Sequence, residues 1–126
     1  MYDMKRAPRS LCCPPKSAFL KIARIPPVLV VGIRSTFAVL ASATRIRLLH
    51  ALAREGEAAV GELAGLSGLK IAAASNQLRR MAAQGVVGSR REGKEIYYFM
   101  VDPCVGELLD RGACLAIDAR RRTRAR

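Results

Sequence analysis

Hydrophobic residues recur at helical spacing from about residue 37 onward, whereas the chain before that point shows no sustained period. The first 34 residues contain five of the six prolines, which interrupt regular structure. This contrast predicts a mostly irregular, basic N-terminal arm over residues 1–35, with at most a helical turn near residues 20–24. We expect the folded domain to occupy residues 36–119, and residues 120–126 to form a solvated, arginine-rich tail.

Two helices are predicted at the start of this domain. Phe37 and Leu40 begin a short helix, and Ser42 or Thr44 can cap a second one that stops before Gly56. The apolar residues that share one face of the second helix are Ile46, Leu49, Leu52 and Ala53.

The next two predicted helices are separated by a tight break. A short helix begins near Val60, the pair Ser67 and Gly68 interrupts it, and a longer helix spans residues 69–84. The apolar face of the longer helix consists of Ile71, Ala74, Leu78, Met81 and Ala82. Two short helices joined by a turn that contains glycine are typical of a helix-turn-helix.

A β-hairpin and a last helix complete the predicted domain. Residues 86–90 and 95–101 have the composition of two strands, and residues 91–94 supply a turn with glycine at its tip. Asp102 followed by Pro103 is a strong signal for the start of a helix, which we expect to run to about Ala119. The predicted fold class is mainly α with a small β-hairpin wing, a winged helix-turn-helix.

The net charge of +12 favours a polyanionic partner, nucleic acid before an acidic membrane. Between Lys70 and Lys94 there are six basic residues and one acidic residue, so part of the excess lies on the predicted helix-turn-helix and hairpin. The longest apolar run, residues 28–33, is far shorter than the roughly 20 residues that a spanning helix needs. We therefore expect no membrane partner.

Several motifs occur in a specific order and spacing: residues 40–52 (LASATRIRLLHAL), 62–64 (ELA), 68–69 (GL), 74–78 (ASNQL), 85–87 (GVV) and 90–98 (RREGKEIYY). Together they resemble the ArsR/SmtB family of winged helix-turn-helix repressors over roughly residues 36–118. The resemblance implies a homodimeric transcriptional repressor that binds double-stranded operator DNA.

The residues expected to contact DNA lie on the longer helix of the helix-turn-helix and on the wing. Short amides and hydroxyls suit base edges, and an asparagine or glutamine can pair with adenine, whereas arginines one turn further on suit phosphates. The candidates are Lys70, Ala72, Ser75, Asn76, Gln77, Arg79 and Arg80 on the helix, and Arg90, Arg91 and Lys94 on the wing. The helix starts with Lys-Ile-Ala-Ala where the family commonly has a Ser-Gln-Ser type run, so fewer base hydrogen bonds are available there. Ser67 stands where the family usually buries a leucine.

The resemblance implies two possible metal sites, and this sequence lacks the complete set of ligands for either. The family's site on the third helix corresponds here to Ala59 and Gly61, and its site on the last helix would use Asp102 or Asp110 without a nearby histidine. The sole histidine, His50, is expected on the outer face of its helix. Four cysteines could bind a soft metal or metalloid ion, across a dimer or with the arm, or could pack as small hydrophobes: Cys12, Cys13, Cys104 and Cys114.

The last helix carries an apolar stripe that suits a dimer seam, formed by Val105, Leu108, Leu109 and Leu115. We expect a cytoplasmic protein with free thiols. No acid/base pair or activated nucleophile is recognisable, so we do not expect an enzyme. The alternative function is a basic packaging or RNA-associated protein that binds nucleic acid by charge without base readout.

Overall fold

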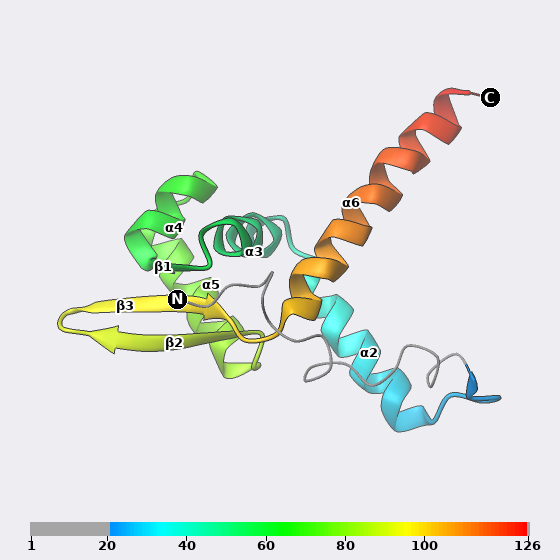
Figure 1. Cartoon of the computed structure of the whole chain (residues 1–126), viewed down its shortest axis with the longest axis horizontal. Coiled ribbons are helices and arrows are strands. Elements are labelled where there is room, and N and C mark those ends of the chain that lie inside the picture. The colour runs from blue at the N-terminus through cyan, green and yellow to red at the C-terminus, as the bar shows by residue number, and fades with distance from the viewer. Residues whose placement is uncertain (1–20, 126) are drawn as a thin grey trace.

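The computed structural model describes residues 21–125 (Figure 1). Its elements follow the order of a winged helix-turn-helix, which confirms the predicted fold class. They are α2 (Pro27–Leu40), α3 (Ala43–Glu55), β1 (Glu57–Ala59), α4 (Val60–Ser67), α5 (Ile71–Ala83), β2 (Val87–Glu92), β3 (Glu95–Met100) and α6 (Pro103–Arg124).

Local signals set most of the helix ends. The Ser42 hydroxyl accepts a hydrogen bond from the backbone N–H of Arg45 at 3.4 Å and caps α3. Gly68 ends α4 in the left-handed region at φ 68°, and the next N–H, that of Leu69, bonds back to the Ala64 carbonyl at 2.9 Å. The Asp102 carboxylate accepts from the Cys104 N–H at 2.8 Å at the start of α6. These capped ends confirm the predicted starts of α3 and α6 and the predicted end of α4.

The hairpin belongs to a three-stranded antiparallel sheet with the order β1-β3-β2. The short strand β1 is a feature that the sequence pattern did not predict. Its residue Ala58 pairs with Tyr98, and both side chains are buried. In β2, Gly88 stands opposite Phe99, and a Cβ at Gly88 would lie 2.4 Å from the Phe99 ring. Glycine therefore lets this ring cover the strand.

One hydrophobic core joins the helices to the sheet. Its largest fully buried side chains come from three helices and from two strands. They are Leu48, Leu49 and Leu52 of α3, Leu63 of α4, Leu78 and Met81 of α5, and Val87 and Met100 of the sheet. Because α5 contributes two of them, its orientation is fixed by the core.

The N-terminal boundary differs from the prediction. The sequence predicts irregular chain through residue 35 and a short helix from Phe37, but the structure contains one helix, α2, from Pro27 to Leu40. Pro27 occupies the first helical turn, where its fixed φ favours a helix and its missing N–H costs nothing. Residues 1–20, with Cys12 and Cys13, lie outside the described part of the chain, and the division into arm, domain and tail stays a prediction.

The last helix and two apolar faces also differ. α6 continues to Arg124, into the segment predicted as a solvated tail, because arginine is a good helix former and basic residues favour the negative end of the helix dipole. Ile46 and Ile71 are 44% and 63% exposed instead of lying in the core. Ile71 is the first residue of α5, and the first buried residue of this helix is Ala74, one turn further on.

Among residues 21–125, no single helix is long and apolar enough to cross a membrane. α2 and α3 meet that length and composition only as a pair, and they are bent at 86° to each other.

The turn of the helix-turn-helix yields a stability prediction. Gly68→Ala should lower the free energy of unfolding by about 1 kcal/mol, because an L-residue is strained in the left-handed region even though the space for a Cβ is open. Urea denaturation of the full chain at a fixed protein concentration measures the change.

Gly61→Ala is the matched control, since Gly61 lies inside α4 with open space around it. We expect this substitution to raise the free energy of unfolding by roughly 0.5–1 kcal/mol. Equal shifts for the two variants would contradict the assigned role of Gly68.

Candidate nucleic-acid interface

The outer face of α5 is set by what its inner face buries. Ala74, Leu78 and Met81 are fully buried, so the residues between them turn outward. Asn76 is exposed, and Gln77 is half-buried where α5 packs on α3. The remaining candidates on α5 are Ala72, Arg79 and Arg80, which are exposed, and Ser75, which is half-buried. The structure therefore brings the predicted residues of this helix together on one outward surface.

The first turn of α5 is apolar and has no side-chain cap. Lys70 is the N-cap residue and is exposed, and no acidic residue stands in the first turn. Ile71, Ala72 and Ala73 follow it and are also exposed. The free backbone N–H groups give this end a partial positive charge that attracts anions, and the small apolar side chains allow close approach of a partner.

Gln77 is held by a residue that the sequence analysis did not single out. The Arg45 Nε of α3 donates to Gln77 Oε1 at 3.0 Å, and its Nη1 donates to the Val39 carbonyl of α2 at 3.2 Å. One guanidinium thus connects α2, α3 and α5. The contact with Gln77 joins residues 32 positions apart, so no local pattern could have revealed it.

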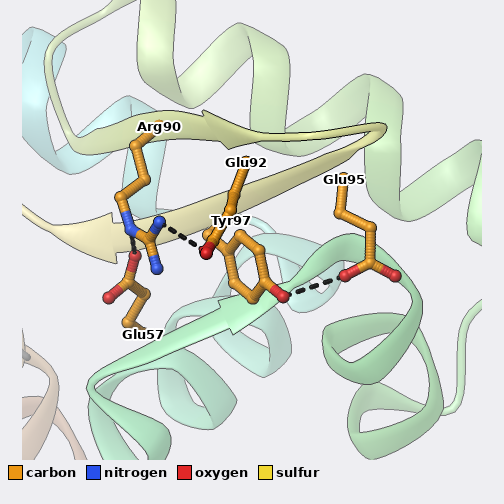
Figure 2. A network of polar contacts seen from close by, with 5 residues as sticks. All are labelled: Glu57, Arg90, Glu92, Glu95 and Tyr97. Carbon is orange, nitrogen blue, oxygen red and sulfur yellow. Dashed lines mark hydrogen bonds and ion pairs between the residues drawn. The ribbon is translucent and has the colours of Figure 1, made fainter.

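The wing has two chemically different faces because side chains alternate along a strand. On one face, Arg90 forms ion pairs with Glu57 of β1 and with Glu92, the latter at 2.8 Å (Figure 2). Its guanidinium also lies 4.7 Å from the centre of the Tyr97 ring. The Tyr97 hydroxyl donates to Glu95 at 2.9 Å. This face carries three carboxylates and one arginine, so it does not suit a polyanion.

The charges on this face shift the titration of two of its groups. The hydrogen bonds to Glu92 and then Glu57 raise the pKa of Arg90 above its usual range, which keeps the guanidinium cationic. The hydrogen bond to Glu95, reinforced by the Glu95 charge, raises the pKa of Tyr97 because the protonated phenol is the donor. Both shifts favour the protonated form of the group.

The other face of the wing continues the surface of the core. Val87, Tyr98 and Met100 are buried on it, and Arg91 follows them in the alternation, paired with Ile96 near the tip. Lys94 is exposed in the turn. Arg91 therefore lies on the side of the sheet that faces the helices, whereas Arg90 lies on the opposite side. The alternation thus places the adjacent residues Arg90 and Arg91 on opposite faces of the wing, and Lys94 lies in the turn at its tip.

The predicted dimer seam divides into two parts. Val105, Leu108 and Leu109 are half-buried and pack against the chain's own core. Leu115 is 66% exposed, on the part of α6 that projects away from the winged domain (Figure 1). α2 adds further exposed apolar residues, among them Val28, Val31 and Phe37.

The cysteines within residues 21–125 do not form a metal cluster with other ligands. No group of three or more histidine, cysteine, aspartate or glutamate residues in this part of the chain could hold an ion. Cys104 is half-buried and, with Asp102, lines an open pocket of about 410 Å³ between α2, the α5–β2 turn and the start of α6. Cys114 is exposed on α6, and His50 is exposed on α3 as predicted.

The chain is similar to known transcriptional regulators, although no protein-family model matches it. The cadmium resistance transcriptional regulatory protein CadC of Listeria innocua is 32% identical over 76 residues, which is 60% of this chain and 64% of that protein. The match thus spans less than two thirds of that relative.

Solved structures extend the likeness over more of the chain. The AntR antimony-specific transcriptional repressor is 40% identical, with a TM-score of 0.75 over 86% of this chain and 98% of that one. A homodimeric winged helix-turn-helix DNA-binding domain from Mycobacterium bovis, described as a possible ArsR-family regulator, is 27% identical. Its TM-score is 0.66 over 80% of this chain and 95% of that one.

Proposed function

The chain belongs to the ArsR/SmtB family of winged helix-turn-helix regulators, and from that premise we propose that it is a homodimeric repressor that binds operator DNA. The observation that carries the proposal is the outward polar face of α5, which the buried Ala74, Leu78 and Met81 hold in one orientation. A repressor acts where the chromosome is, so we place the protein in the cytoplasm.

The proposed division of labour follows from the chemistry of each side chain. Asn76 and Gln77 read base edges in the major groove, and Ala72 contacts thymine methyl groups. Ser75 hydrogen-bonds at the groove wall. Lys70, Arg79 and Arg80 bind phosphates beside the helix, and Arg91 and Lys94 bind the backbone reached by the wing.

We further propose a soft metal or metalloid ion as effector. The relatives named for cadmium and antimony support this class of ligand. Cys104 lines a pocket that Gln84 and Val86 also line at the exit of α5, so a ligand bound in this pocket would lie beside the recognition helix. Since the described residues supply no complete ligand set, ligands for the ion would come from Cys12 and Cys13 or from a second subunit.

The test of the function is sequence preference. We expect the protein to bind a discrete site upstream of its own gene, and Asn76→Ala to cost about 1–3 kcal/mol on that site and little on random DNA. Footprinting and titration by fluorescence anisotropy measure both affinities. Adding cadmium or trivalent antimony to the same titration tests the effector.

Gln84→Ala is the control, because Gln84 is an exposed amide at the other end of α5. It should leave the preference unchanged. Equal affinity of the wild-type protein for upstream and random DNA would instead support the packaging alternative.

The two faces of the wing predict different salt dependences. Arg91→Ala and Lys94→Ala should each lower the slope of log K against log salt by about one, because each removes one phosphate contact. Arg90→Ala is a matched control, since Arg90 is occupied by Glu57 and Glu92 on the other face. A lower slope for Arg90→Ala with no change for Arg91→Ala would reverse the assignment of the faces.

The dimer is tested on the exposed part of the seam. Leu115→Glu should yield monomers at micromolar concentration, because a buried carboxylate without a partner is costly in an apolar seam. A monomer would no longer present two recognition helices about 34 Å apart, so operator binding should fall sharply. Sedimentation velocity measures the assembly.

Ile117→Glu is the control, since Ile117 is also exposed but lies on nearly the opposite side of α6. This variant should remain dimeric. A monomeric wild-type protein, or identical behaviour of the two variants, would contradict the proposed seam.

A further inference from the structure

We propose that Arg45 determines which end of the Gln77 amide is presented to DNA, so that Gln77 acts as a hydrogen-bond donor and favours guanine or thymine over adenine. This inference rests on the proposed function. It goes further, because it assigns a positioning role to a residue outside the recognition helix and predicts the class of base edge that one position reads.

The guanidinium of Arg45 is anchored from two sides. Its Nε donates to Gln77 Oε1 at 3.0 Å, and its Nη1 donates to the Val39 carbonyl at 3.2 Å. Val39 lies in the last turn of α2, whose carbonyls have no partner further along the helix. Arg45 and Gln77 are both half-buried, which limits competition from water. The planar guanidinium is therefore oriented before any DNA arrives.

The chemistry of arginine fixes the orientation of the amide. A guanidinium has donors and no acceptor, so only the oxygen of Gln77 can face it. A hydrogen bond from a charged donor is stronger than one between neutral groups, which disfavours a flipped amide. The Gln77 oxygen is thus engaged within the protein, and the NH₂ group remains for an external partner.

This orientation changes the expected base preference. Pairing of a glutamine with adenine uses both ends of the amide, because the oxygen accepts from N6 while the nitrogen donates to N7. Guanine offers two adjacent acceptors, N7 and O6, and thymine offers O4, so each suits a donor alone. Adenine offers one acceptor, N7, beside an N6 donor that an amide presenting only its NH₂ group cannot satisfy. The preference for adenine that residue type alone suggests for Gln77 is therefore reversed by its contact with Arg45.

Selection of binding sites from a randomised duplex library tests the inference. The wild-type protein should select guanine or thymine at one position, and Gln77→Ala should lose the preference at that position. Gln77→Glu keeps a partner for Arg45 but presents an acceptor, so it should select cytosine or adenine there. Arg45→Met frees both ends of the amide and should raise binding to the adenine site about tenfold relative to the guanine site.

Two comparisons separate positioning from a merely structural role. Arg47→Met makes the same change at an exposed residue of α3 and should alter no base preference. In the Gln77→Ala background, Arg45→Met should have no further effect on base preference, and any change in affinity should be the same for all DNAs. Circular dichroism confirms folding, and Gln77→Glu provides the decisive readout if Arg45→Met does not fold.

The outcomes distinguish this inference from the function on which it rests. A wild-type protein that selects no common sequence overturns sequence-specific binding, and the inference with it. A wild-type protein that selects a site at which Gln77→Ala and Gln77→Glu change nothing leaves the function intact and overturns the inference. Selection of adenine at the position that Gln77→Ala relaxes also overturns it.

Discussion

The burial of one face of α5 is the constraint on which the rest of the molecule depends. Leu78 and Met81 are fully buried against α3 and α4, and each such side chain stabilises the fold by roughly 1.5–3 kcal/mol. An exposed ion pair contributes only about 0–1 kcal/mol. The core therefore decides how α5 is rotated, and Asn76, Arg79 and Arg80 face outward as a consequence.

Burial also orients the side chains of the wing. Side chains alternate between the two faces of a strand, so one buried residue fixes the side on which its neighbours lie. Because Val87 enters the core, Arg91 lies on the helix side of the sheet and Arg90 on the other side, where Glu57 of β1 meets it (Figure 2). Adjacent arginines in the sequence thus acquire different roles. Arg90 is held by carboxylates and ties the wing to β1, whereas Arg91 is exposed on the opposite face of the wing.

The sequence predicts those parts of the fold that depend on local signals. The Ser42 cap, the left-handed Gly68 and the pair of Asp102 and Pro103 each mark a helix end within a few residues, and the structure confirms all three. The unpredicted parts depend on distant partners. β1 is three residues long and forms because β3 pairs with it, and the Arg45 contact with Gln77 joins two helices. The prolines before α2 were misleading because proline breaks a helix inside but favours its first turn.

The exposed helices make the strongest physical case for a partner. Residues 110–125 are exposed throughout, so the second half of α6 gains no stability from its own domain. An isolated helix shorter than about 12–15 residues is only marginally stable in water. α2 has the same difficulty, since Val28 is 85% exposed although most of this helix is apolar. The proposed dimer would stabilise both helices, because a second copy would cover exposed apolar residues of α2 and the Leu115 side of α6. Since Val39 of α2 also accepts a hydrogen bond from Arg45, the surface that would hold the two subunits together is connected by two hydrogen bonds to Gln77 on the helix that would read DNA.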